Sequence, residues 1–245
     1  MADEQKRVPD KNRGLTSFHL KVIAAAAMLL DHVGVVFLEA PLEAAGYSLL
    51  ANMLAGTPLF GQAVAYTVLR LIGRIAFPIY AFMIAEGMRH TRNKRRYQTR
   101  LLIGALVSEI PFDLAMHGMP VDWSGQNVFW TLLLGALAID GFTREWNREW
   151  LRYLWPVVAA ALAQLMATDY GAYGILVICL FHVAGGDRQR RAALLVVPLA
   201  FQATAPLALL PIHVYNGGKG PSARWPFYAF YPAHLLALFL IKIAL

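Results

Sequence analysis

Cysteine is nearly absent from this chain. Cys179 is the single one among 245 residues, so an internal disulfide is excluded. Charge is scarce as well, because Asp, Glu, Lys and Arg make up 15% of the residues whereas 58% are hydrophobic. Soluble domains of this length are much less apolar. Since several apolar runs approach the roughly 20 residues that a bilayer-spanning helix needs, the sequence predicts an integral membrane protein.

The signatures of several enzyme classes are also missing. The sequence holds no GxxxxGK phosphate loop, no GxSxG nucleophile elbow, no HExxH zinc motif and no CxxC pair. The seven histidines are scattered, so we expect no metal site. No internal repeat is evident, which argues against a secondary transporter built from inverted repeats.

Eight apolar segments are expected to cross the membrane. They cover residues 18–38, 61–88, 101–117, 128–142, 151–167, 170–183, 192–211 and 227–243. We therefore predict an all-α integral membrane protein with a single bundle of about eight transmembrane helices in residues 18–245, after a polar cytoplasmic tail at 1–17. Gly73 and Pro78 interrupt the second span and three prolines interrupt the seventh, so some helices should be kinked or broken.

The placement of the basic residues indicates membrane topology rather than nucleic-acid binding. With the N-terminus in the cytoplasm, 18 of the 22 Lys and Arg residues fall on the cytoplasmic side, as the positive-inside rule requires. Arg70 and Arg74 then lie within a span. Lys219 and Arg224 lie outside, because the connections 39–60 and 213–226 are assigned to the external face.

Lys21 and His32 are the most informative ionisable pair in the apolar spans. They lie eleven residues apart in LKVIAAAAMLLDHVG, a spacing that advances a helix by roughly 16 Å and returns it to within about 20° of the same face. We expect the ammonium at a membrane edge and the imidazole about half a bilayer deeper. A neutral imidazole in a partly dry cavity can serve as a general base. A purely structural histidine is the alternative.

Asp31 precedes His32 directly but is poorly placed to orient it, because adjacent helical residues point about 100° apart. We expect Asp31 to hold a cation from another helix and His32 to find its orienting partner elsewhere. Arg70 and Arg74 share a helical face and need anions, either ligand phosphates or protein carboxylates. The available carboxylates are those of Asp31, Glu109 and Asp113. An active site and a set of helix-locking ion pairs both fit this pattern.

The segment RHTRNKRRYQTR, residues 89–100, holds six Lys or Arg residues and no acid. It is either a topogenic loop that faces lipid headgroups or a grip for the phosphates of a cofactor, to which Arg is matched by geometry. Other polar residues near span ends are expected to cap helices or to pack, and these are Asn127, Asp140, Asp169 and His234. Glu86 should form an ion pair at the cytoplasmic edge with Arg89 or His90.

Together these residues resemble the TraX family, membrane proteins linked to N-terminal acetylation of conjugative F-type pilin. Five segments match in the family's order between Leu20 and Leu238. They are LKVIAAAAMLLDHVG, LRLIGRIAFPIYAFMIAEGMRHTRNKRRYQTRLLIGALVSEIPFDLA, NVFWTLLLGALAID, DYGAYGILVI and FYAFYPAHLL.

The TraX family in turn is similar to the family-three membrane acyltransferases, of which it looks like a compact relative. Those enzymes have an Arg or Lys and, after ten intervening residues, a His in their first span, a spacing matched here by Lys21 and His32. Their FF-x-x-SGF stretch with a trailing basic cluster resembles FPIYAFMIAEGM followed by RNKRRYQTR. Ala85 and Glu86 replace the serine before the glycine, so a role for that serine does not carry over.

The resemblance implies a multi-pass acetyltransferase of the bacterial cytoplasmic membrane, with acetyl-CoA as the cytoplasmic donor and no metal. The expected acceptor is the N-terminus of a pilin subunit, and O-acetylation of a glycan or lipid is an alternative. A non-catalytic pilin assembly factor and a small-molecule or lipid transporter are others. The expected catalytic residues are His32 as base, Asp31, and Arg74 for the oxyanion. The expected cofactor-binding residues are Lys21, Arg70, Arg92, Arg95, Arg96 and Arg100.

Overall fold

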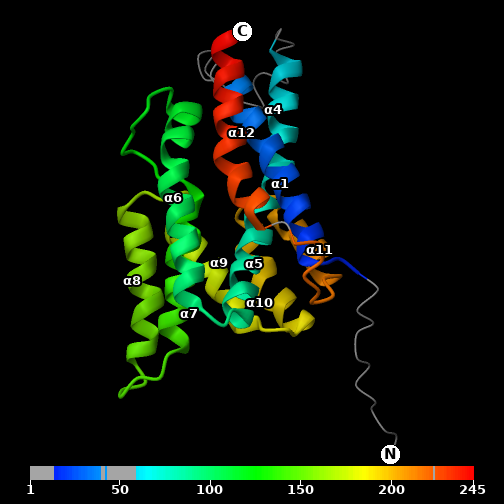
Figure 1. The fold of residues 1–245 in the computed structure, drawn as a ribbon. Helices are drawn as coiled ribbons and strands as arrows, with labels where there is room; N and C mark the ends of the chain where they lie inside the picture. The colour runs from blue at the N-terminus through cyan, green and yellow to red at the C-terminus, as the bar shows by residue number, and fades with distance from the viewer. Residues whose placement is uncertain (1–13, 40–41, 43–58, 223) are drawn as a thin grey trace, which may run out of the picture.

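The computed structural model describes residues 14–39, 42, 59–222 and 224–245, and these are helical as expected (Figure 1). The α-helices are α1 (Ser17–Gly34), α4 (Phe60–Gly73), α5 (Ala76–His90), α6 (Lys94–His117), α7 (Val128–Thr143), α8 (Leu151–Leu165), α9 (Gly171–Ala184), α10 (Arg188–Ala200), α11 (Leu209–His213) and α12 (Arg224–Ala244). A π-helical turn η1 (Val35–Glu39) extends α1, and a 3₁₀ turn η2 (Ala205–Ala208) precedes α11. Among the described residues only isolated β-bridges occur, and no strand.

Three segments of the described chain are long and apolar enough to cross a membrane. They are Ser17–Glu39, Phe60–His90 and Trp225–Ala244. Three shorter apolar helices, α7, α8 and α9, have 14 to 16 residues each. The apolar helices make this a membrane protein, but the expected count of about eight spans is not confirmed. Residues 1–13 of the expected tail and most of the connection 39–60 lie outside the described residues.

The second expected span is broken where the sequence places Gly73. Helix α4 ends at this glycine, a turn follows at Arg74 and Ile75, and α5 begins at Ala76. The break accommodates Asp31 of α1, because a Cβ atom on Gly73 would overlap the Oδ1 atom of Asp31. The irregularity therefore brings a carboxylate of α1 against the backbone between α4 and α5.

The seventh expected span does not cross the molecule, which corrects the prediction for residues 192–211. The chain reverses direction after α10. Residues 201–204 form a turn, and η2 and α11 then run back beside α10 (Figure 1). Arg191 in the first turn of α10 donates a hydrogen bond to the carbonyl of Ile212 near the end of α11, at 3.4 Å. At the tip, the hydroxyl of Thr204 donates to the carbonyl of Leu71 in α4. Residues 188–213 thus form a re-entrant hairpin.

The direction of α12 is the second correction to the expected topology. The segment before α12 pairs with the residues before α1: the amide of Leu15 donates to Val214 at 3.0 Å, and that of Ser17 donates to Gly218 at 2.8 Å. Consequently 213–226 and the start of α1 lie at the same end, not on opposite faces. Helices α1 and α12 run in the same direction, and the C-terminus lies at the other end of the molecule (Figure 1).

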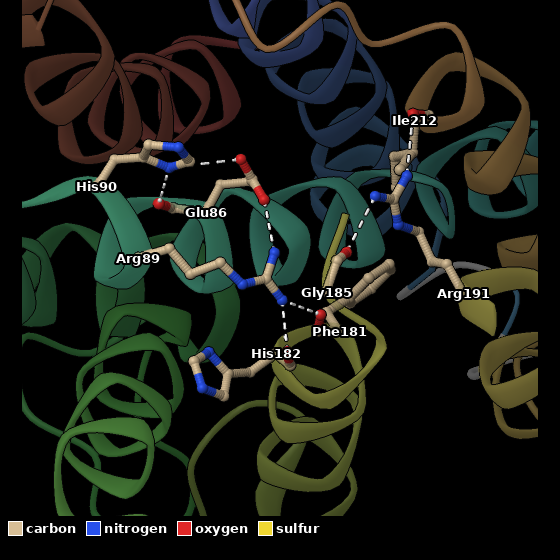
Figure 2. Close-up of polar contacts among 8 residues, drawn as sticks. All are labelled: Glu86, Arg89, His90, Phe181, His182, Gly185, Arg191 and Ile212. Carbon is tan, nitrogen blue, oxygen red and sulfur yellow. Dashed lines mark hydrogen bonds and ion pairs between the residues drawn. The ribbon is translucent and has the colours of Figure 1, made fainter. Parts of the chain in front are cut away.

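The end of the bundle where α5 and α9 finish is closed by two arginines (Figure 2). Arg89 donates to the carbonyls of Phe181 and His182 at the end of α9, at 2.6 and 2.5 Å. It also pairs with Glu86 at 2.6 Å, which confirms the ion pair expected from the sequence. Arg191 donates to the carbonyl of Gly185 at 3.2 Å. Cations at helix C-termini satisfy carbonyls that have no partner within the helix.

Candidate functional site

A pair of histidines joins α1 to α12. The His32 Nδ1 atom lies 2.7 Å from the His234 Nε2 atom, and the two rings are nearly coplanar, with 9° between their planes. The second ring nitrogen of His234, Nδ1, lies 2.8 Å from the carbonyl oxygen of Phe230. The sequence predicted that His32 has an orienting partner other than Asp31 but did not indicate which residue. The structure shows that His234 is in contact with it. Since α1 begins at Ser17, His32 lies about 22 Å along the helix.

Asp31, which directly precedes His32 in the sequence, forms an ion pair. The Asp31 Oδ2 atom accepts a hydrogen bond from Arg70 of α4 at 2.6 Å, and both side chains are mostly buried. Asp31 thus holds a cation from another helix, as expected, and it is the carboxylate that Arg70 needed. The other oxygen of Asp31, Oδ1, is buried without a hydrogen-bond partner among the described residues.

Arg74 has no carboxylate within ion-pair distance in the described part of the chain. It lies in the turn between α4 and α5, within electrostatic range of Asp31 and Asp169. Arg70, expected to bind the cofactor, forms an ion pair with Asp31, so the two arginines differ in their partners within the described chain.

The short connection before α9 brings Asp169 to this group of charges. Its backbone is unusual, because Ala167 and Tyr170 have positive φ angles of 50° and 69°, a conformation that is strained for residues other than glycine. Tyr170 stacks on Phe77 at the start of α5, with 3.7 Å between ring centroids. The hydroxyl of Thr131 donates to the carbonyl of Asp169. The connection is thus held rigidly where α5, α7 and α9 meet.

Lys21 and His32 both contact α12, as their shared helical face predicts. The Lys21 ammonium lies 5.7 Å from the ring centroid of Phe227 in the first turn of α12. Arg100 of α6 contacts the next residue, Tyr228. Two of the expected cofactor-binding cations thus flank the start of α12, and His32 of α1 contacts α12 further along, at His234.

Arg92 and Arg95 lie elsewhere, on a groove between the start of α6, the end of α7 and the start of α8. Its volume is about 470 Å³, and its lining includes Lys94, Arg144 and the ring of Trp155. The Asp140 carboxylate in the groove is bound by Lys94 at 2.8 Å and lies within electrostatic range of Arg144, whereas neither Arg92 nor Arg95 forms an ion pair with a described residue that lines it. Arg96 is exposed on the first turn of α6 and does not line the groove.

Glu109 and Asp113 have partners other than the two arginines. Glu109 accepts from the indole of Trp130 at 2.8 Å and from the side chain of Asn127, whereas Asp113 accepts from the amide of Asp122 at 2.9 Å. These carboxylates fasten the connection between α6 and α7. They are not the counterions of Arg70 and Arg74.

Two residues that the sequence assigned to capping or packing, Asp169 and His234, reach the site through tertiary contacts. The only sequence signals were that both are polar residues near the end of an apolar segment and that each falls in a segment resembling the TraX family. His32 and His234 are 202 positions apart. No local pattern can indicate such a pairing. No group of three or more His, Cys, Asp or Glu side chains suited to a metal occurs among the described residues.

The fold is that of a helical membrane protein in which an ion pair and a histidine pair join apolar helices. The family profile described as TraX protein matches residues 17–242, and the chain belongs to this family. It is also 26% identical over 258 residues to "Probable fimbrial assembly protein FimC, serogroup H1" of Dichelobacter nodosus, covering 93% of this chain and 96% of that protein. No solved structure matches the chain.

Proposed function

We propose that this TraX-family protein is a membrane acetyltransferase that moves an acetyl group from cytoplasmic acetyl-CoA to the N-terminal amine of a pilin subunit. The observation that carries the proposal is the oriented His32–His234 pair, which lies beside the Asp31–Arg70 ion pair within apolar helices. Ionisable groups in such surroundings are costly and tend to be retained for function. The similarity to a protein named for fimbrial assembly supports a pilin-related acceptor.

In the proposed reaction, His32 accepts a proton from the acceptor amine as its nitrogen attacks the thioester carbonyl. The carbonyl oxygen becomes an oxyanion, and Arg74, which has no carboxylate within ion-pair distance in the described chain, donates to it. Oxyanion donors contribute about 3–4 kcal/mol in other acyl-transfer sites. The intermediate then collapses with cleavage of the carbon–sulfur bond, and the proton on His32 passes to the leaving CoA thiolate.

The donor would approach from the end that carries most of the cations. Lys21 and Arg100 at the start of α12, together with the groove of Arg92 and Arg95, supply guanidinium and ammonium groups for phosphates. We place this end in the cytoplasm and the membrane as the bacterial inner membrane. This orientation obeys the positive-inside rule.

The mechanism is tested by two substitutions in purified protein with radiolabelled acetyl-CoA. His32→Ala removes the proposed base and should lower kcat by about 10²- to 10⁴-fold. Lys21→Ala should mainly raise KM for acetyl-CoA. Full turnover by His32→Ala contradicts the role of His32, and an unchanged KM in Lys21→Ala contradicts the role of Lys21. Tracing the label into protein, lipid or glycan identifies the acceptor.

A non-catalytic assembly factor is the second candidate, because the similar protein is named for assembly rather than for a reaction. In that case the buried charges only lock helices together. The two candidates differ in donor binding, since a ligand that binds the folded state raises the unfolding temperature. Acetyl-CoA should stabilise the detergent-solubilised enzyme, whereas a pilin-binding scaffold should not respond.

A further inference from the structure

The hydrogen bonds around the histidine pair define where its protons lie. The carbonyl oxygen of Phe230 can only accept, so the His234 Nδ1 atom at 2.8 Å must donate to it. In a neutral imidazole the other nitrogen is then an acceptor. The His32 Nδ1 atom, 2.7 Å from the His234 Nε2 atom, therefore donates its hydrogen to it. By the same reasoning, the neutral ring of His32 has no proton on Nε2.

We propose that His234 is a positioning residue that keeps the proton of His32 on Nδ1, so that Nε2 presents its lone pair to the acceptor. The expected effect of His234 on turnover rests on the proposed acetyltransferase function. The proton it holds on His32 follows from the contacts alone. His234 is 7% exposed, and Phe230 stacks on it with 4.7 Å between ring centroids. Tyr231 contacts both histidines edge-on, at 6.1 and 5.6 Å between centroids. These contacts restrict rotation of either ring.

The same contact would strengthen as the reaction proceeds. When His32 takes a proton on Nε2, its ring becomes cationic and its Nδ1–H bond to His234 becomes charge-assisted. Charge-assisted hydrogen bonds are roughly twice as strong as neutral ones. An interaction that is stronger in the transition state than in the ground state lowers the barrier. His234 should therefore affect kcat much more than KM for acetyl-CoA.

The kinetic test compares three variants. His234→Phe keeps a ring against Phe230 but removes the acceptor, and we expect kcat to fall by about 10²- to 10⁴-fold, as loss of histidine orientation does in other enzymes. His234→Gln offers an amide oxygen to His32 and should recover at least about tenfold of that loss. His182→Phe is the matched control, since His182 contacts Phe142 edge-on and its Nδ1 has no hydrogen-bond partner in the described chain. Full kcat in a folded His234→Phe protein overturns the proposal.

A second measurement does not need activity. Nitrogen-15 NMR of histidine-labelled protein distinguishes protonated from unprotonated ring nitrogens, and His32→Ala assigns the signals. The wild type should show His32 protonated on Nδ1 alone, and His234→Phe should show a mixture of tautomers. A proton on Nε2 in the wild type contradicts the inference whatever the activity. If the expected tautomer is found but the wild type transfers no acetyl group, the proposed function fails and the positioning of His32 by His234 stands.

Discussion

At the scale of single residues, the site depends on a glycine that carries no chemistry. Gly73 ends α4, and Asp31 fills the space that its side chain would occupy. The Asp31 atoms nearest to that space include Cβ as well as Oδ1, so a rotation of the carboxylate alone cannot make room. The close approach of α1 to α4 is what allows Arg70 to reach Asp31.

Gly73→Ala should therefore separate α1 from α4 and weaken the Asp31–Arg70 ion pair. We expect a loss of about 1–3 kcal/mol, the usual cost of overpacking, measured as a lower unfolding temperature of the solubilised protein. Gly61→Ala is the control within the same helix, because, apart from its chain neighbours and the backbone of its own helix, no described atom lies within 4 Å of the place that its added methyl group would take. Equal stability of the two variants would contradict the role given to Gly73.

At the scale of elements, the re-entrant hairpin 188–213 is held at both ends by hydrogen bonds from side chains. Arg191 fastens its base to Ile212 and Gly185, and Thr204 fastens its tip to α4. Tyr173 of α9 donates to the carbonyl of Pro198 at 3.2 Å. These side chains supply partners for backbone carbonyls at the base and the tip of the hairpin, and such partners are obligatory wherever backbone is in contact with lipid.

Arg191→Met should loosen the base of the hairpin, because it removes two hydrogen bonds from a charged donor, each worth about 1.5–3 kcal/mol. Amide hydrogen exchange in residues 188–213 should become faster, while exchange in α1 stays unchanged. Arg190→Met is the control, since the neighbouring Arg190 is exposed in the same turn. Unaltered exchange in Arg191→Met would show that the arginine does not secure the hairpin.

At the scale of the whole molecule, the parallel course of α1 and α12 determines which residues share a side. Lys219 and the start of α12 lie with the beginning of α1, since the hydroxyl of Ser17 donates to the carbonyl of Lys219 at 2.8 Å. Lys242 lies in the last turn of α12, and the C-terminus that follows is at the opposite end of the molecule (Figure 1). The excess of Lys and Arg at the end where α1 begins is therefore larger than in the expected topology, which placed Lys219 and Arg224 on the other face.

Fusion of reporters to the two termini tests this arrangement. Alkaline phosphatase fused after Leu245 should be active, because that enzyme matures only outside the cytoplasm, whereas a fluorescent protein at the N-terminus should fold inside. The expected eight-span topology placed both termini in the cytoplasm. A fluorescent and phosphatase-inactive C-terminus would contradict the parallel course of α1 and α12.

The sequence indicated which polar residues belong to the site, but it did not indicate which of them contact one another. The membrane class, the break near Gly73, the cation held by Asp31 and the family follow from composition, spacing and matching segments. His234 and Asp169 were assigned to capping or packing, because local patterns report periodicity and hydropathy but not which helices meet. Arg70 and Arg74 were equivalent in sequence, and only the contact with Asp31 distinguishes them.

The sequence alone determined that this chain enters a membrane, that it belongs among TraX-like proteins, and that Lys21 and His32 share one face of a helix. Only the tertiary structure decided that 192–211 turns back, that α12 runs parallel to α1, and that His234 meets His32. The physical reason is that hydropathy measures how well a segment tolerates lipid. Whether such a segment crosses or returns, and what it touches, depends on contacts between residues far apart in the chain.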